Sequence, residues 1–217
     1  MIKTVDVPQE LRVFNTLFFD FQHRHELSQV FDDLLTIIIC CMGRGTNEDL
    51  YFETIKRYNA KELDSFARLF AELMKFYIKA KEAEQWCDPL GEYYELLASN
   101  YKKSRFGQFF TPKPLCDMMA MMIINADEWG KNINEPCSGS GRMVLAANHQ
   151  AKGNYYVCED LDPLCCKMTA INLCFHDIRG EVHCHNALTR DESRFSFAVN
   201  YEFWKNNTNT ILQYKPS

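Results

Sequence analysis

The sequence lacks a surplus of positive charge. Its 217 residues contain 24 Lys and Arg against 29 Asp and Glu, which gives a formal net charge of −5. A protein that binds nucleic acid unaided usually carries a basic face, because phosphate contacts supply much of the affinity. Any contact with DNA is therefore expected to be weak for this chain alone, or to depend on another subunit.

Long hydrophobic runs are also missing. The longest apolar stretch, residues 34–42, is interrupted by Thr36 and is far shorter than the roughly 20 residues of a membrane-spanning helix. No apolar signal segment stands at the N-terminus. These absences predict a cytoplasmic chain without membrane contact.

The ten cysteines follow neither a metal-ligand pattern nor a disulfide framework. Two pairs are adjacent in the sequence, at 40–41 and 165–166, and no Cys-x-x-Cys spacing occurs. Disulfide scaffolds belong to short secreted chains, so reduced cysteines are the simpler interpretation. The Cys and His residues between 158 and 185 leave a zinc site as an alternative, but without ligand spacing we expect buried thiols and no metal.

Apolar residues recur at helical spacing in the first part of the chain. The clearest run follows Asn59, a candidate N-cap, and consists of Leu63, Phe66, Leu69, Leu73 and Tyr77. We predict an α-helical region over residues 1–88 and a second domain over residues 89–217. The Phe-rich segment 14–21 is expected to pack internally, with a docking surface for another subunit as the alternative.

The pattern changes after residue 88. Short runs suited to strands, at 133–135, 155–159, 181–185 and 195–199, alternate with helical stretches at 114–124, 143–151 and 163–175. This alternation predicts an α/β domain with a parallel, doubly wound sheet. The four methionines between residues 118 and 122 are expected to fill the core.

One segment between a predicted strand and a predicted helix carries the strongest signal for ligand binding. It is Glu135-Pro136-Cys137-Ser138-Gly139-Ser140-Gly141, in which glycines allow a sharp turn and the close approach of a ligand. Glu159 and Asp160 follow about 20 residues later, where an acidic side chain holds ribose hydroxyls in nucleotide-binding folds. An ordinary glycine-rich turn is the alternative if the two glycines are taken alone.

The charge of this glycine loop, residues 135–141, indicates which adenosine-containing ligand fits. A pyrophosphate is bound by backbone N–H groups or by a lysine. This loop instead begins with the carboxylate of Glu135 and has no Gly-Lys-Ser/Thr ending. A carboxylate suits a ligand with a cationic amino group and a sulfonium, which describes S-adenosylmethionine.

Four segments between about residues 88 and 200 share a further pattern. They are Leu90-Gly91-Glu92-Tyr93-Tyr94-Glu95, Gly107-Gln108-Phe109-Phe110-Thr111-Pro112, the glycine loop, and Asp160-Leu161-Asp162-Pro163. Together they resemble the N6-adenine DNA methyltransferases of bacterial type I restriction-modification systems. The resemblance implies a Rossmann-like, S-adenosylmethionine-dependent domain that methylates adenine in DNA, with a specificity subunit as a possible partner.

The resemblance also assigns residues to the cofactor, and its register favours Asp160 over Glu159. The family's acidic residue after the third strand, which contacts the adenine ring, corresponds to Asn186, whose amide can still bond an adenine edge. Arg142, directly after the loop, is expected at a surface turn, with contact to a carboxylate as the alternative. The implied cofactor-binding residues are Gln108, Phe109, Phe110, Thr111, Pro112, Glu135, Ser138, Gly139, Ser140, Gly141, Asp160, Leu161, Asn186 and Ala187.

Catalysis in this family depends on an Asn/Asp-Pro-Pro-aromatic motif after the fourth strand, which holds the amine of an extruded base. The nearest match is Asn200-Tyr201-Glu202-Phe203, so Asn200 and Phe203 are the candidate catalytic residues. Both prolines are absent. Since proline fixes the backbone that presents the motif, the resemblance implies that activity is reduced or lost.

The ending of the sequence leaves several interpretations open. The chain stops 14 residues after Phe203, so the sheet is expected to be incomplete and a target-recognition domain to be missing. The chain is then a fragment, a degenerate homologue, or one completed by a partner. An inactive cofactor-binding or protein-interaction module of a restriction-modification or mobile-element system is the alternative to an active enzyme, and a helical interaction protein with the sheet as scaffold is a third.

Overall fold

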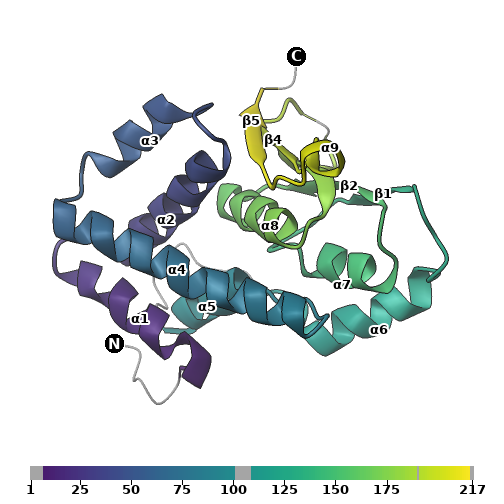
Figure 1. Cartoon of the computed structure of the whole chain (residues 1–217), viewed down its shortest axis with the longest axis horizontal. Helices are drawn as coiled ribbons and strands as arrows, with labels where there is room; N and C mark the ends of the chain where they lie inside the picture. The colour runs from purple at the N-terminus through teal and green to yellow at the C-terminus, as the bar shows by residue number, and fades with distance from the viewer. Residues whose placement is uncertain (1–6, 101–108, 190, 216–217) are drawn as a thin grey trace.

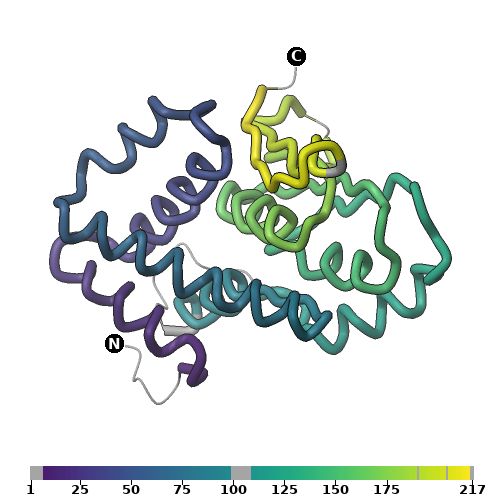
Figure 2. The backbone as a smooth tube through the Cα atoms, in the orientation of Figure 1, coloured from purple at the N-terminus to yellow at the C-terminus, as the bar shows by residue number. Residues whose placement is uncertain are grey.

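A group of helices and a small sheet make up the molecule, and they lie side by side (Figure 1). The structure, a computed structural model, describes residues 7–100, 109–189 and 191–215. The helical part contains η2 (Gln9–Leu11), α1 (Arg12–Phe19), η3 (Asp20–His23), α2 (Leu27–Met42), α3 (Glu48–Ile55), α4 (Ala60–Glu82) and α5 (Pro89–Asn100). Figure 2 shows α1–α3 on the left, α4 running across the middle of the molecule, and the last strands, in yellow, at the top. No helix of the described part is long and apolar enough to cross a membrane.

Helix α4 confirms the helical spacing seen in the sequence. It begins with a capping box, in which Asn59 accepts the backbone N–H of Glu62 and Glu62 accepts that of Asn59. One face buries apolar side chains, namely Phe66, Leu69, Leu73, Tyr77 and Ala80, and the ring of Tyr77 lies 4.9 Å from that of Phe175 in α8. The amphipathic pattern therefore places Tyr77 toward the interior.

The Phe-rich segment 14–21 packs internally, as predicted. Phe14 and Phe18 lie 4.7 and 5.2 Å from the ring of Tyr93, in edge-to-face contact, and all three are buried. Tyr93 belongs to α5, beyond the expected boundary at residue 88. A single hydrophobic core therefore runs from the helical part into the sheet part.

Three strands form the parallel part of the sheet, and each lies where the sequence predicts one. They are β1 (Asn132–Glu135), β2 (Tyr155–Asp160) and β3 (Arg179–Cys184), in spatial order β1-β2-β3. The connecting helices are α7 (Arg142–Gln150) and α8 (Pro163–Phe175), and α8 contacts β2, β3 and α2. The carboxyl ends of the three strands meet at one edge, which we call the carboxyl edge.

The last two strands depart from the expected parallel sheet. Strand β4 (Ser196–Val199) pairs antiparallel with β3, and β5 (Ile211–Tyr214) pairs antiparallel with β4, after the short helix α9 (Phe203–Asn206). The sheet is thus a mixed five-stranded one. Because only about ten residues separate β3 from β4, the connection is too short for the helical crossover that a parallel pairing needs.

Helix α6 (Lys113–Ile123) is less buried than its methionines suggest. Cys116 and Ala120 are its buried residues, and it packs against α7. Met118, Met121 and Met122 are exposed. The prediction that the methionine run fills the core is therefore wrong for these three residues, because the helix turns its small side chains inward.

Candidate functional site

The glycine loop joins the carboxyl end of β1 to α7. Gly139 and Gly141 have φ values of 57° and 93°, a left-handed conformation that favours glycine. The backbone N–H of Ser138 donates to the carbonyl of Glu159 at 2.9 Å, and that of Gly141 donates to Ser138 at 2.7 Å. A Cβ atom on Gly139 would lie 2.9 Å from the ring of Phe110. The sequence therefore places this turn correctly, and its first glycine is also needed for close packing.

Asp160, at the end of β2, holds the glycine loop by its side chain. One carboxylate oxygen accepts the N–H of Gly139 at 2.8 Å, and the other accepts that of Asp162 at 2.9 Å. The residue is buried, and Thr169 of α8 donates to the carbonyl of Gly139 at 2.9 Å. Each carboxylate oxygen has a further acceptor position, so Asp160 can support the loop and still receive a hydroxyl group.

Glu135 brings a second carboxylate to the same edge. It is the last residue of β1, is half-buried, and accepts the N–H of Cys137 at 3.2 Å. Burial raises the pKa of Glu135 above its ordinary value, and the nearby charge of Asp160 raises it further. A cation placed beside Glu135 would relieve both effects.

The ends of β2 and β3 supply the other predicted side chains. His185 donates its backbone N–H to the carbonyl of Asp160 at 3.0 Å, which brings the turn after β3 beside that after β2. In this turn the side chain of Asn186 accepts the N–H of Leu188 at 3.0 Å, and Ala187 is half-buried. Leu161 is exposed. These residues therefore lie at the carboxyl edge together with Asp160.

The segment before α6 reaches the glycine loop from a distant part of the sequence. Phe110 touches Gly139, and its ring lies 5.3 Å from that of Tyr94. The carbonyl of Thr111 accepts Arg142 at 3.4 Å, and Pro112 is the N-cap of α6. Phe109 points into solvent, with 85% of its surface exposed, and Gln108 lies outside the described residues.

Arg142 is buried, so the expectation of a surface position is wrong. Its Nε donates to Asp88 at 2.6 Å, and its Nη2 donates to Glu95 at 2.8 Å. Asp88 also accepts Ser140 at 2.6 Å and the N–H of Gly91 at 2.9 Å. Burial raises the pKa of Asp88, while Arg142 opposes that effect. Because donors surround the carboxylate, we treat it as ionised.

Asp88 and Arg142 were not identified as site residues from the sequence. Asp88 precedes a proline and looks like a domain boundary, whereas it is the acceptor that joins α5 to the glycine loop. The signal that could have found it is Gly91. A Cβ atom there would lie 2.0 Å from the carboxylate of Asp88, so only glycine allows that approach.

Asn200 and Phe203 do not join the carboxyl edge. Since β4 is antiparallel to β3, Val199 pairs with Gly180 near the start of β3, and Asn200 follows at the opposite edge. Asn200 is fully buried, and its Nδ2 lies within 3.0–3.2 Å of the carbonyl oxygens of Leu173, Cys174 and Ile178. Asn200 thus follows the fourth strand, as expected, but lies apart from Glu135 and Asp160, and its side chain closes the end of α8.

The cysteines near the site are mostly buried. Burial raises the pKa of the thiols of Cys158, Cys165 and Cys174 far above the ordinary value, so they are poor nucleophiles. Across the residues that the structure describes, no cluster of three or more His, Cys, Asp or Glu side chains is arranged to hold a metal ion.

Comparison with known proteins gives two findings. A family described as N-6 DNA Methylase matches residues 85–213, which is more than half of the chain. A solved structure of the methyltransferase subunit of a type I restriction-modification system from Streptococcus thermophilus is similar, with a TM-score of 0.43 and 20% sequence identity over 82% of this chain. The chain spans 40% of the length of that subunit.

Proposed function

Because this chain belongs to the N-6 DNA methylase family, we propose that its carboxyl edge binds S-adenosylmethionine. The observation that carries this proposal is the arrangement of Glu135, Gly139 and Asp160. Asp160 holds the left-handed turn at Gly139, and Glu135 stands beside it with a raised pKa. Within the described part of the chain, no Lys or Arg forms an ion pair with Glu135.

The side chains present fit the groups of this cofactor. Glu135 offers a carboxylate to a cationic amine, and Asp160 offers its remaining acceptor positions to ribose hydroxyls. Asn186 can bond the edge of an adenine ring after a small rearrangement of its turn. Phe110, which packs on Gly139 and Tyr94, closes the loop on its outer side. When bound, the cofactor would supply an electrophilic methyl group.

We propose adenine in DNA as the methyl acceptor. We further propose that the protein acts in the cytoplasm and that its partners are DNA and a specificity subunit. The position of Asn200 favours a second candidate, a cofactor-binding subunit without chemistry of its own. Asn200 is buried, and its Oδ1, the atom that would accept a hydrogen bond from a target amine, already accepts the backbone N–H of Thr210 at 3.1 Å. The two candidates differ in methyl transfer and agree on cofactor binding.

Photochemical crosslinking tests the cofactor site directly. The protein would be irradiated with S-adenosylmethionine labelled in its methyl group, digested, and the labelled peptides sequenced. The proposal predicts label in peptides that contain residues 109–112, 135–141 or 160–188. An excess of unlabelled cofactor should abolish it. Label confined to α1–α4, or label that excess cofactor does not reduce, would reject the assignment.

A further inference from the structure

A buried chain of polar side chains joins α4 to the glycine loop. The hydroxyl of Tyr77 on α4 donates to Oδ1 of Asn172 on α8 at 2.7 Å. The Nδ2 of Asn172 donates to Asp88 at 2.8 Å and to the backbone carbonyl of Ser140 at 2.7 Å. All four residues are buried. Because these groups are buried, water cannot replace a hydrogen bond that is lost, so breaking any one of them is costly.

The amide of Asn172 has only one orientation that satisfies these neighbours. Asp88 and the Ser140 carbonyl are both acceptors, so the NH2 group must face them and the oxygen must face Tyr77. Tyr77 then supplies a donor to that oxygen. If the hydroxyl of Tyr77 were removed, Oδ1 of Asn172 would remain buried without a hydrogen-bond donor, and the amide of Asn172 would be held less firmly.

Ser140 belongs to the glycine loop, so the orientation of Asn172 reaches the proposed cofactor site. The side chain of Ser140 donates to Asp88, and its carbonyl accepts Asn172. Both bonds lie between Gly139 and Gly141, the two residues whose left-handed conformations shape the loop. The loop is thus fixed from below by α8 and α5, at a distance of 63 residues along the chain from Tyr77.

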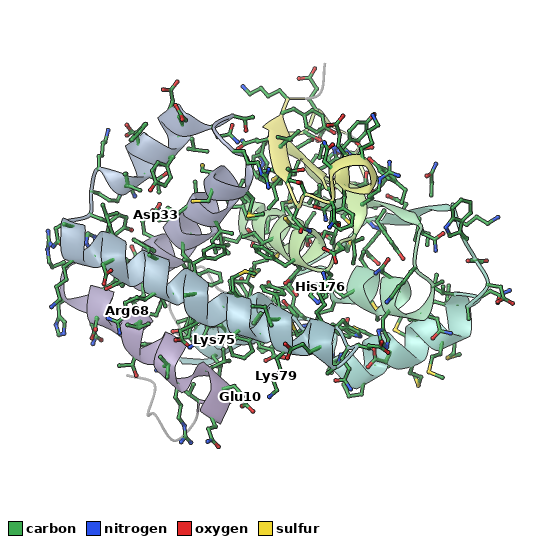
Figure 3. All side chains as sticks on the ribbon, viewed as in Figure 1. Glu10, Asp33, Arg68, Lys75, Lys79 and His176 are labelled. Carbon is green, nitrogen blue, oxygen red and sulfur yellow. The ribbon has the colours of Figure 1, made fainter. Side chains whose placement is uncertain are left out.

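His176 reinforces the same junction from the end of α8. Its Nδ1 lies 2.8 Å from the carbonyl of Asn172 and therefore donates, and its Nε2 accepts the N–H of Cys87 at 3.1 Å. The ring of His176 also meets that of Tyr77 edge to face at 5.4 Å. Figure 3 shows His176 next to the C-terminal part of α4.

We propose that Tyr77 and Asn172 are positioning residues for the glycine loop, so that the helical half of the protein sets the affinity of the cofactor site. The effect on S-adenosylmethionine binding rests on the proposed function. The hydrogen bonds that link Tyr77, Asn172 and the loop do not depend on it. The hydroxyl of Tyr77 donates to Asn172, and Asn172 in turn bonds the loop, so the hydroxyl acts on the loop through Asn172.

Tyr77→Phe is the test, with Tyr58→Phe as a matched control. Tyr58 is also buried in the helical half and donates its hydroxyl to a carboxylate, that of Asp33, at 2.6 Å. Tyr77→Phe should weaken the binding of S-adenosylmethionine about tenfold, the equivalent of one net hydrogen bond. Tyr58→Phe should leave the dissociation constant unchanged. In the Asn172→Leu background, Tyr77→Phe should have no further effect on binding.

Hydrogen exchange of the protein without ligand gives a second readout that does not depend on cofactor binding. Tyr77→Phe should speed amide exchange in the peptide that covers residues 137–144, whereas Tyr58→Phe should not. Equal stability losses in the two variants, with unchanged exchange and affinity in both, would overturn the inference. If the wild-type protein does not bind the cofactor, the proposed function fails, and the exchange data alone decide the role of Tyr77.

Discussion

Glu135 combines a partly buried position with a charge that no described Lys or Arg neutralises. Burial and Asp160 raise its pKa. A positively charged ligand would therefore stabilise the carboxylate of Glu135, whereas an anionic ligand would add to the repulsion from Asp160. This local electrostatic property distinguishes the loop from a phosphate-binding loop, which presents N–H groups or a lysine to its ligand.

Glu135→Gln should weaken the binding of S-adenosylmethionine about tenfold, because the amide keeps the shape and loses the charge. The pH dependence has a definite sign. Binding a cation needs the ionised carboxylate, so affinity is present at neutral pH and is lost as the pH falls through the raised pKa of Glu135. Calorimetric titration over a pH series would check this, with Glu128→Gln as the control. A wild-type affinity for Glu135→Gln at every pH would contradict it.

His176 makes stability depend on pH. Burial of the ring lowers its pKa from 6.5 to about 4, because the charged form loses its hydration, and the hydrogen bond to the Asn172 carbonyl opposes this effect only in part. The neutral ring donates to Asn172 and accepts from Cys87. The unfolded chain takes up the proton between these two values and the folded chain does not. As the pH falls from about 6.5 to about 4, protonation of His176 in the unfolded chain should lower the free energy of unfolding by about 3 kcal/mol.

Urea denaturation of the wild type and of His176→Gln between about pH 7 and about pH 4 isolates this contribution. The variant should be less stable at neutral pH and should lose less stability on acidification. Parallel pH profiles for the two proteins would show that His176 does not contribute in this way.

The glycine loop is the element on which the account depends. Gly139 and Gly130 both have positive φ, at 57° and 68°. A Cβ atom on Gly139 would meet Phe110 at 2.9 Å, whereas one on Gly130 would meet nothing within 4 Å. The two positions thus separate the conformational cost of a left-handed residue from the cost of displacing Phe110.

Gly130→Ala should reduce the free energy of unfolding by about 1 to 2 kcal/mol, the cost of the left-handed conformation, and Gly139→Ala should reduce it further because Phe110 must move. Only Gly139→Ala should also weaken cofactor binding, because it moves Phe110 and the loop. Thermal unfolding and cofactor titration of both variants would measure the two effects. Equal affinities for Gly139→Ala and Gly130→Ala would mean that the contact with Phe110 has no part in binding.

The elements also show where the sequence was sufficient. Strands β1–β3, helices α6–α8 and the position of the glycine loop follow from period and turn chemistry, which are local. The direction of β4 does not. Its apolar run reads the same in either direction. The pairing is decided by the short connection from β3, which the prediction of a parallel sheet does not consider. Strand β5 and helix α9 were likewise not predicted.

The burial of Arg142 was missed for a related reason. A charged side chain after a turn is usually at the surface, and only the tertiary approach of Asp88 and Glu95 makes burial possible. The residues around Arg142 in the sequence do not predict that Asp88 and Glu95 pack against it. The residues of the candidate site that depend on contacts between distant segments were therefore the ones the sequence could not supply.

At the scale of the whole molecule, the helical half and the sheet half form one structural unit. Tyr93 packs against α1, and Asp88 and Asn172 join α5, α8 and the glycine loop. A division at residue 88, which the change in pattern suggests, would cut through this junction. Methyl transfer also requires groups that hold a target base. Asn200, the candidate for this role, lies at the end of the strands opposite the carboxyl edge.

The isolated chain should therefore transfer methyl groups to DNA poorly or not at all, even if it binds the cofactor. Small displacements of positioning groups can cost about a hundredfold in rate, and a net charge of −5 gives little attraction to phosphates. Transfer of labelled methyl to duplex and single-stranded DNA, with and without a specificity subunit, would measure this. Robust transfer by the chain alone, abolished by Asn200→Ala, would show that residues 200–203 form a working motif.

The most direct test of the central claim is a calorimetric titration of the full chain with S-adenosylmethionine and, separately, with ATP. Both ligands contain adenosine, but they differ in the sign of the charge that would face Glu135. The account predicts saturable binding of S-adenosylmethionine at one site, and no binding of ATP at the same concentrations. Equal affinity for the two ligands, or no binding of S-adenosylmethionine, would contradict it.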